Sequence, residues 1–229
     1  MAKTATDRVP RAGGRSGPPA SAGGRRWVVP VVALAVVLLA GAVAIGASAL
    51  GRNAGTDAAQ PQRAPVTVTG EALPPMPSGG AADAAIGQPA PSLQGTTLTG
   101  EPITVPGAGK AKLVMFLAHW CPHCQKEVPI LTDYLPDNTP ADVELYSIAT
   151  ATDSSLPNYP PVAWLDREGW PVVTMADSES NTAGQAYGVT GYPMFVAVDA
   201  AGNVVARRSG ELSTAEVQSM LDAAASGAQ

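Results

Sequence analysis

Cysteine is scarce in this chain of 229 residues, which contains only Cys121 and Cys124. Two cysteines cannot form the set of disulfides that holds many small secreted domains together. A disulfide between residues only three positions apart closes a very short loop, so it would stabilise little by restricting the unfolded chain. The pair therefore indicates redox or metal chemistry rather than a structural cross-link.

Charged residues are also few, at 14% of the chain, and they are unevenly placed. Residues 1–26 hold six basic residues and one acid, so the rest of the chain has a net charge of −10 against −5 for the whole. An acidic main body argues against nucleic acid as a partner. The basic segment lies beside an apolar run, which suggests that it sets membrane topology.

That apolar run extends from Trp27 to Gly51 without a charged residue. Its length as a helix is sufficient to cross a hydrocarbon core of roughly 30 Å. Because the stronger basic cluster precedes it, we expect residues 1–26 to be a disordered cytoplasmic tail, 27–51 a single-pass transmembrane anchor and the remainder exported. The alternative is a signal peptide cleaved after about Ala49, although the apolar run is longer than such peptides require.

The composition changes twice after the predicted anchor. Residues 52–85 are dominated by Ala, Gly, Pro, Gln and Thr and show no apolar period, so we expect a flexible linker. Residues 86–229 show the alternation of apolar runs and turn residues that is typical of a folded domain.

Apolar patterns within 86–229 predict both strands and helices. The strands are expected at 93–98, 103–105, 112–118, 143–149, 172–175, 194–198 and 204–207. Helices are expected from Pro122, at 160–169, at 182–187 and after Ser213, which forms a capping box with Glu216. This order predicts an α/β fold with a central mixed sheet, helices on both faces and an extra N-terminal β-hairpin.

The two cysteines lie in the run Trp120-Cys121-Pro122-His123-Cys124, directly after the apolar strand 112–118. Pro122 suits the first position of a helix, which places Cys121 at the helix start. The helix dipole and the unpaired amides there favour a thiolate, the attacking species in disulfide exchange. Cys124 lies one turn later on the same face, where it can resolve a mixed disulfide, and His123 adds a partial positive charge nearby.

Four stretches carry a resemblance to a known family. Residues 86–225 resemble the thioredoxin superfamily and, within it, the TlpA-like extracytoplasmic branch of the ResA/DsbE type. The stretches are Ile86–Pro91 with the hairpin that follows, Phe116–Pro129, Gly188–Pro193 and Asp199–Asn203. A CxxC motif after a buried strand, followed some 70 residues later by Gly-Tyr-Pro, is a specific combination.

The resemblance implies an enzyme that exchanges disulfides through a redox-active Cys121–Cys124 disulfide. Cys121 would be the nucleophile and Cys124 the resolving thiol. Pro193 would be a cis-proline that faces the disulfide, and Tyr192 would pair with substrate backbone. No metal and no cofactor is implied.

The resemblance also implies roles for the neighbours of the cysteines. Trp120 would border the substrate surface, and Pro122 and His123 would tune the redox potential. Glu127 matches an acidic position near the active site of this branch, although a solvated charge in the first turns of a helix is an equal alternative. Where thioredoxin has a buried acid this chain has Met115, so proton transfer to Cys124 would need Glu127 or water. We expect His119 to be exposed, with a minor role.

Two other functions stay open at this stage. Cys121, Cys124, His119 and His123 could form a metal site, but four ligands from six residues can hardly surround one ion. A non-enzymatic binding module with a passive disulfide is the other alternative.

The implied partners are the thiols and disulfides of exported proteins and a membrane redox partner. The direction of electron flow is open. His123 favours an oxidase, whereas the better-known roles of the branch favour a reductase, for example in cytochrome c maturation.

Overall fold

The computed structural model describes residues 61–79 and 81–227. The predicted tail (1–26), the predicted anchor (27–51) and residues 52–60 of the predicted linker lie outside the described residues. Within the described ranges, no helix combines the length and the apolar character needed to cross a membrane.

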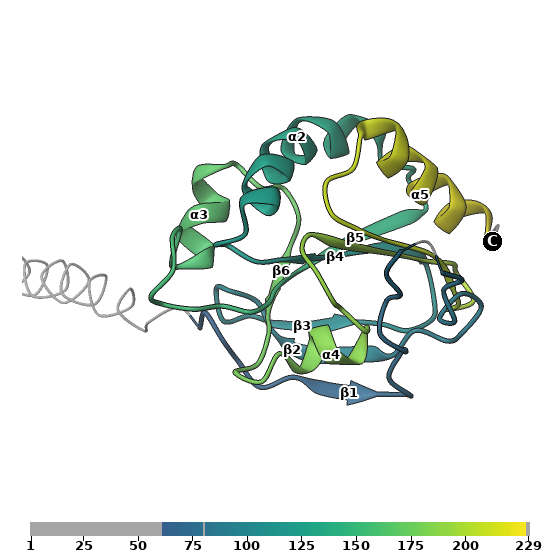
Figure 1. The fold of residues 1–229 in the computed structure, drawn as a ribbon, viewed down its shortest axis with the longest axis horizontal. Helices are drawn as coiled ribbons and strands as arrows, with labels where there is room; N and C mark the ends of the chain where they lie inside the picture. The colour runs from purple at the N-terminus through teal and green to yellow at the C-terminus, as the bar shows by residue number, and fades with distance from the viewer. Residues whose placement is uncertain (1–60, 80, 228–229) are drawn as a thin grey trace, which may run out of the picture. The chain divides into compact units, whose positions relative to one another are not determined.

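A five-stranded mixed sheet forms the centre of the domain (Figure 1). Strand β4 (Ala111–Leu117) lies in the middle, parallel to β5 (Val143–Ala149), which is in turn parallel to the edge strand β6 (Thr174–Ala176). On its other side β4 pairs antiparallel with β7 (Met194–Val198), and β7 pairs antiparallel with β8 (Val204–Ser209). The predicted α/β fold with a mixed central sheet is therefore confirmed.

Strand β4 is buried along its whole length. Successive side chains of a strand point to opposite faces, so a strand covered on both faces is apolar along most of its length. Leu113 and Met115 pack on one face of the sheet, and Val114 and Phe116 pack on the other. The continuous apolar run in the sequence thus reflects a strand between two cores.

Helices α2 (Pro122–Asn138) and α5 (Thr214–Ser226) cover one face of the sheet (Figure 1). Their apolar stripes include Leu131 and Leu221, which belong to the same core cluster as Met115. The capping box at the start of α5 is confirmed, because the Ser213 hydroxyl accepts a hydrogen bond from the Glu216 amide and the Glu216 carboxylate accepts one from the Ser213 amide.

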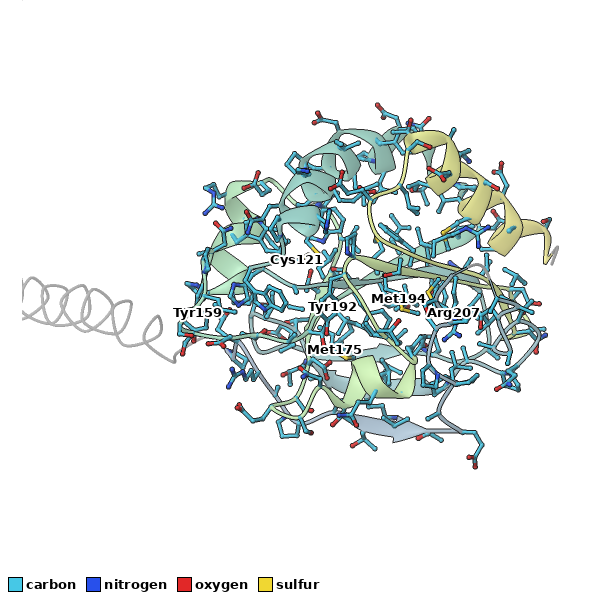
Figure 2. The ribbon with its side chains drawn as sticks, viewed as in Figure 1. Cys121, Tyr159, Met175, Tyr192, Met194 and Arg207 are labelled. Atoms are coloured by element: carbon cyan, nitrogen blue, oxygen red, sulfur yellow. The ribbon has the colours of Figure 1, made fainter. Side chains whose placement is uncertain are left out.

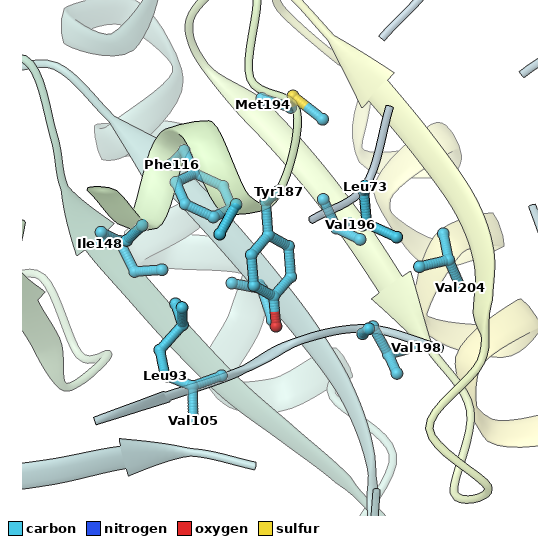
Figure 3. Packing of buried hydrophobic residues seen from close by; sticks show 14 of the residues in the cluster. Leu73, Leu93, Val105, Phe116, Ile148, Tyr187, Met194, Val196, Val198 and Val204 are labelled. Atoms are coloured by element: carbon cyan, nitrogen blue, oxygen red, sulfur yellow. The ribbon is translucent and has the colours of Figure 1, made fainter. Parts of the chain in front are cut away.

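The opposite face is covered by α4 (Thr182–Ala186) and by a second sheet of strands β1 (Thr67–Thr69), β2 (Ser92–Thr96) and β3 (Pro102–Val105). Figure 3 shows Tyr187, which follows α4, among the apolar side chains of this core. Its ring lies 5.2 Å from that of Phe116, and its hydroxyl donates to the Pro91 carbonyl at 2.9 Å. Helix α3 (Pro161–Arg167) packs beside the end of β4 that leads to the cysteines.

The predicted flexible linker is wrong over residues 61–79 and 81–85. Strand β1 pairs antiparallel with β2, so the predicted N-terminal hairpin is part of a three-stranded sheet. Leu73 is buried, and its amide donates to Ala186 at 2.8 Å. The physical reason is that backbone hydrogen bonds and a few apolar side chains bind this segment to distant parts of the chain, which a local apolar period does not reveal.

Candidate active site

Cys121 lies where the central strand ends and α2 begins (Figure 2). It is the N-cap residue of α2, with extended backbone angles, and Pro122 occupies the first turn. The first amides of a helix have no intrahelical partner, so this end favours a negative charge. Cys121 is 7% exposed, and both cysteines are free thiols in the structure.

Tyr192 and Pro193 lie next to the Cys121 thiol. The antiparallel register of β4 and β7 pairs Phe116 with Met194, which brings the residues before β7 to the end of β4 where the cysteines follow. The Tyr192–Pro193 peptide bond is cis, as the family resemblance implies. The Cys121 thiol donates to the Tyr192 carbonyl at 3.5 Å.

Cys124 lies behind Cys121 with no exposed surface. Its sulfur accepts a hydrogen bond from the Ala118 amide at 3.4 Å. Burial raises the pKa of the Cys124 thiol far above its ordinary value, with a smaller contribution in the same direction from Cys121. The two thiols are therefore unequal: Cys121 keeps a small exposed surface beside a helix terminus, whereas Cys124 is wholly buried and burial favours its neutral form.

Glu127 is a buried carboxyl group one turn of α2 beyond Cys124, and it is 1% exposed. Its two carboxylate oxygens accept from the Leu212 amide at 3.2 and 3.3 Å. Burial raises the pKa of Glu127 to about 7, and the nearby charges of Glu211 and Glu216 act in the same direction. Of the two sequence interpretations, a solvated surface charge is wrong, and a buried acid near the cysteines agrees with the structure.

His123 is exposed and directed to the loop before α5. Its Nδ1 lies 2.6 Å from a carboxylate oxygen of Glu211, and that oxygen also accepts from Lys126 at 3.3 Å. His123 beside Glu211 holds the pKa of that carboxyl below its ordinary value. The sequence predicts a partial positive charge from His123 near Cys121. The structure adds an acid beside it, Glu211, which the sequence analysis missed.

Trp120 is half-buried and connects two segments beside the cysteines. Its indole N–H donates to the Ala151 carbonyl at 2.7 Å. Its ring meets the Tyr192 ring edge-on, with the centroids 6.0 Å apart. Trp120 thereby joins the cis-proline segment to the loop that follows β5.

The prediction that His119 is exposed is wrong. Its side chain is 1% exposed, and both ring nitrogens are within hydrogen-bond distance of the loop between β5 and α3. A polar residue between a buried strand and Trp120 was the available signal. Its partners, Asp153 and Pro157, lie more than 30 residues away, so no local pattern identifies them.

The structure also shows the surroundings of Met115, which stands where thioredoxin has a buried acid. Met115 is completely buried in the apolar core between the sheet and helices α2 and α5. Met115 offers no proton acceptor. The ionisable side chain near Cys124 is Glu127, one turn further along α2. Over residues 61–79 and 81–227, no three side chains of His, Cys, Asp or Glu are grouped so that they could hold a metal ion.

Comparisons with known proteins agree with this arrangement. The model of the Redoxin family matches residues 85–224. The chain is 31% identical over 135 residues to the thiol:disulfide interchange protein DsbE homolog of Paracoccus denitrificans, covering 56% of this chain and 69% of that protein. It is 28% identical over 138 residues to the thiol-disulfide oxidoreductase ResA of Bacillus thuringiensis, covering 59% and 76%.

A solved structure shows a related fold. The thioredoxin-family thiol:disulfide interchange protein of Chlorobium tepidum is 29% identical to this chain, with a TM-score of 0.51 over 62% of this chain and 99% of that one. The fold and the paired thiols define a thiol–disulfide oxidoreductase with a thioredoxin-like domain. The chain belongs to the Redoxin family, and within it to the DsbE/ResA type.

Proposed function

We propose that this protein exchanges disulfides with exported proteins through Cys121 and Cys124. The observation that carries the proposal is the arrangement of the two thiols. Cys121 lies at the N-terminus of α2 and within 3.5 Å of the carbonyl that precedes a cis-proline, and Cys124 is buried directly behind it. A metal-binding or passive module would not need one reactive and one protected thiol.

In the reducing direction, the Cys121 thiolate attacks one sulfur of a client disulfide. The client S–S bond breaks, a Cys121–client disulfide forms and the other client sulfur leaves as a thiolate that takes a proton. Cys124 then loses its proton and attacks the Cys121 sulfur, which releases the second client thiol. Two electrons and two protons pass to the client, and the Cys121–Cys124 disulfide forms.

Glu127 is the group that we propose to exchange a proton with Cys124. The pKa of the Cys124 thiol is raised by burial, so the thiol needs a base at the moment of attack. A carboxyl group whose pKa is raised to about 7 can both take and return a proton near neutral pH. Its hydrogen bond from the Leu212 amide fixes the carboxyl in place.

The contacts of His123 support the reducing direction. A cation beside Cys121 would stabilise its thiolate and make the disulfide more oxidising. Here the Glu211 carboxylate lies against His123 and also accepts from Lys126, so a negative charge offsets part of the positive charge on this side of Cys121. We therefore propose a reductase for client disulfides, supplied with electrons by a membrane partner.

We further propose that residues 27–51 anchor the chain in the cell membrane, with the N-terminus cytoplasmic and the catalytic domain outside. This rests on the uncharged apolar run and the basic residues before it. Retention of the full chain in alkali-washed membranes, with the domain accessible to protease from outside, would support the anchor. Release of a shortened chain would instead indicate cleavage after about Ala49.

Trapping of the mixed disulfide tests the exchange itself. A full-length Cys124→Ser variant should accumulate disulfide-linked exported proteins in cells, because the resolving thiol is missing. The Cys121→Ser variant is the matched control and should accumulate few or none. Equal trapping by both variants, or by neither, would contradict the proposed exchange.

The reduction potential of the pair tests the direction. A value near the roughly −270 mV of thioredoxin would support the reductase, and one near the roughly −120 mV of DsbA would reject it. Glu211→Gln should shift the potential upward by on the order of 10 mV, because exposed charge pairs interact weakly. The same substitution in a His123→Ala, Lys126→Ala background should have no effect, which isolates the charges that Glu211 offsets.

A further inference from the structure

His119, two residues before Cys121, uses its whole imidazole ring to hold one loop. Its Nε2 accepts a hydrogen bond from the Asp153 amide at 3.1 Å, so the proton of the neutral ring lies on Nδ1. Nδ1 then donates to the Pro157 carbonyl at 2.6 Å. Burial lowers the pKa of His119, which agrees with a neutral ring.

The loop held in this way is residues 153–159, between β5 and α3. It is also attached through the backbone of the active-site segment, because the Asn158 side chain donates to the His119 carbonyl at 3.3 Å. Arg167 of α3 donates to the same Asn158 side chain at 2.9 Å. The Tyr159 ring meets the His119 ring edge-on, with the centroids 6.0 Å apart. The position of the loop is thus set from the residue that precedes Trp120 and Cys121.

The loop presents apolar side chains to solvent. Leu156 and Tyr159 are 37% and 44% exposed and are two of only four large apolar side chains that are exposed in the described residues. Figure 2 shows Tyr159 at the margin of the domain, on the same side as α3. The one carboxylate of the loop, Asp153, accepts from both the amide and the hydroxyl of Ser155. The loop therefore offers two exposed apolar side chains and a single carboxylate.

The loop is continuous with the cysteine site. Trp120 connects them, because its indole donates to Ala151 just before the loop and its ring contacts Tyr192 beside the Cys121 thiol. A polypeptide bound at Cys121 has neighbouring residues that extend several ångströms to either side. A small disulfide has no such neighbouring residues.

We infer that His119 is a positioning residue that holds residues 153–159 beside the place where a client binds. Leu156 and Tyr159 of this loop then select polypeptides that have apolar side chains near the reacting cysteine. This inference rests on the proposed function and adds its substrate class. The occupant is an extended segment of an unfolded exported protein, whose apolar residues are still uncovered. Partial burial of one such side chain corresponds to about tenfold in rate or affinity.

The test uses the full-length reduced chain and three probes. Two are linear peptides whose single cysteine is joined by a disulfide to a chromophoric aromatic thiol, with either Leu or Ser on both sides of the cysteine. The third is the same mixed disulfide of cysteine amide, without flanking residues. Release of the aromatic thiol gives the second-order rate for each. The wild type should react about tenfold faster with the Leu peptide than with the Ser peptide.

Two variants should remove this preference. His119→Ala and the surface variant Leu156→Ser with Tyr159→Ser should each bring the Leu-to-Ser ratio to within about twofold of one, because the apolar contact is lost. Both should lower the rate with the Leu peptide more than the rate with cysteine amide, because cysteine amide has no flanking residues. His119→Asn retains a donor toward Pro157 and should restore part of the preference. Ile130→Ser, an exposed apolar side chain on α2, is the matched control and should behave as wild type.

The outcomes separate the inference from the proposed function. An unchanged ratio in the surface variant would overturn the inference, as would an equal fall in the rates of all three probes with His119→Ala. If His119→Ala does not fold, the surface variant alone decides, because its side chains are already exposed. Failure of the wild type to release thiol from any probe would overturn both the inference and the exchange reaction.

Discussion

At the scale of single residues, Glu127 shows how the position of a side chain changes its chemistry. A glutamate in the first turns of a helix is usually solvated, yet this one is buried against the Leu212 amide behind Cys124. The loss of water disfavours its charged form, which raises the pKa of Glu127 from an ordinary 4.5 to about 7. The residue type was visible in the sequence, but its burial depends on the loop before α5, some 85 residues later.

Glu127 should make the stability of the domain depend on pH. Between pH 4.5 and 7 the folded state binds more protons at this group than the unfolded state, so stability falls as pH rises through this interval. The loss should reach roughly 3 kcal/mol above pH 7. Glu127→Gln, which retains an acceptor for the Leu212 amide, should remove it.

The measurement is urea denaturation of the reduced chain at pH 5 and pH 8. Wild type should lose roughly 2.5 kcal/mol more than Glu127→Gln over this interval. Glu101→Gln, at an exposed carboxyl group in the turn between β2 and β3, is the control and should follow wild type. Equal pH dependence in wild type and Glu127→Gln would show that the carboxyl is ionised in the folded state across this range.

At the scale of elements, the ones that could be predicted are those with a strong local signal. A nearly continuous apolar run at 112–118 predicts strand β4, and Pro122 after the first cysteine predicts the start of α2. Strand β1 was missed, because three residues in a Pro- and Gly-rich stretch have no period and are defined only by pairing with β2. Local chemistry therefore predicts an element whose own residues carry a pattern, and it misses an element that only its pairing defines.

Helix α5 gives a prediction at this scale, since its start was predicted from the sequence and is confirmed. Ser213→Ala removes the acceptor for the Glu216 amide and should destabilise the domain by about 1 kcal/mol, as measured by urea denaturation. Thr214→Ala, at the next and exposed position, is the matched control and should change stability by less than about 0.5 kcal/mol. A similar loss in both variants would mean that the cap contributes nothing specific.

At the scale of the whole domain, an ion pair joins the N-terminal segment to the edge of the main sheet. Arg207 of β8 is almost completely buried and donates to both carboxylate oxygens of Asp83, 124 residues earlier in the chain. It also donates to the Pro74 and Tyr187 carbonyls. A sequence pattern assigns an arginine on an edge strand to solvent, so this link and the earlier start of the folded domain could not be predicted.

Loss of this pair should be costly. Asp83→Asn leaves a buried guanidinium without its counter-charge, which should destabilise the domain by about 3–5 kcal/mol in urea denaturation. Glu179→Gln removes the partner of Arg63 in an exposed pair and should cost less than about 1 kcal/mol. Similar small losses in the two variants would contradict a structural role for the buried pair.

The central claim is that Cys121 is the reactive thiol and Cys124 the protected one, and alkylation tests it most directly. The reduced full-length chain is treated with iodoacetamide at pH 6, where an unstructured cysteine is almost wholly protonated, and the modified residue is identified by mass spectrometry. The structure predicts that Cys121 is modified first and Cys124 stays unmodified, because Cys121 keeps some exposed surface at the start of α2 whereas Cys124 has none and burial raises its pKa. Modification of Cys124 first, or modification of the two cysteines at equal rates, would contradict the account.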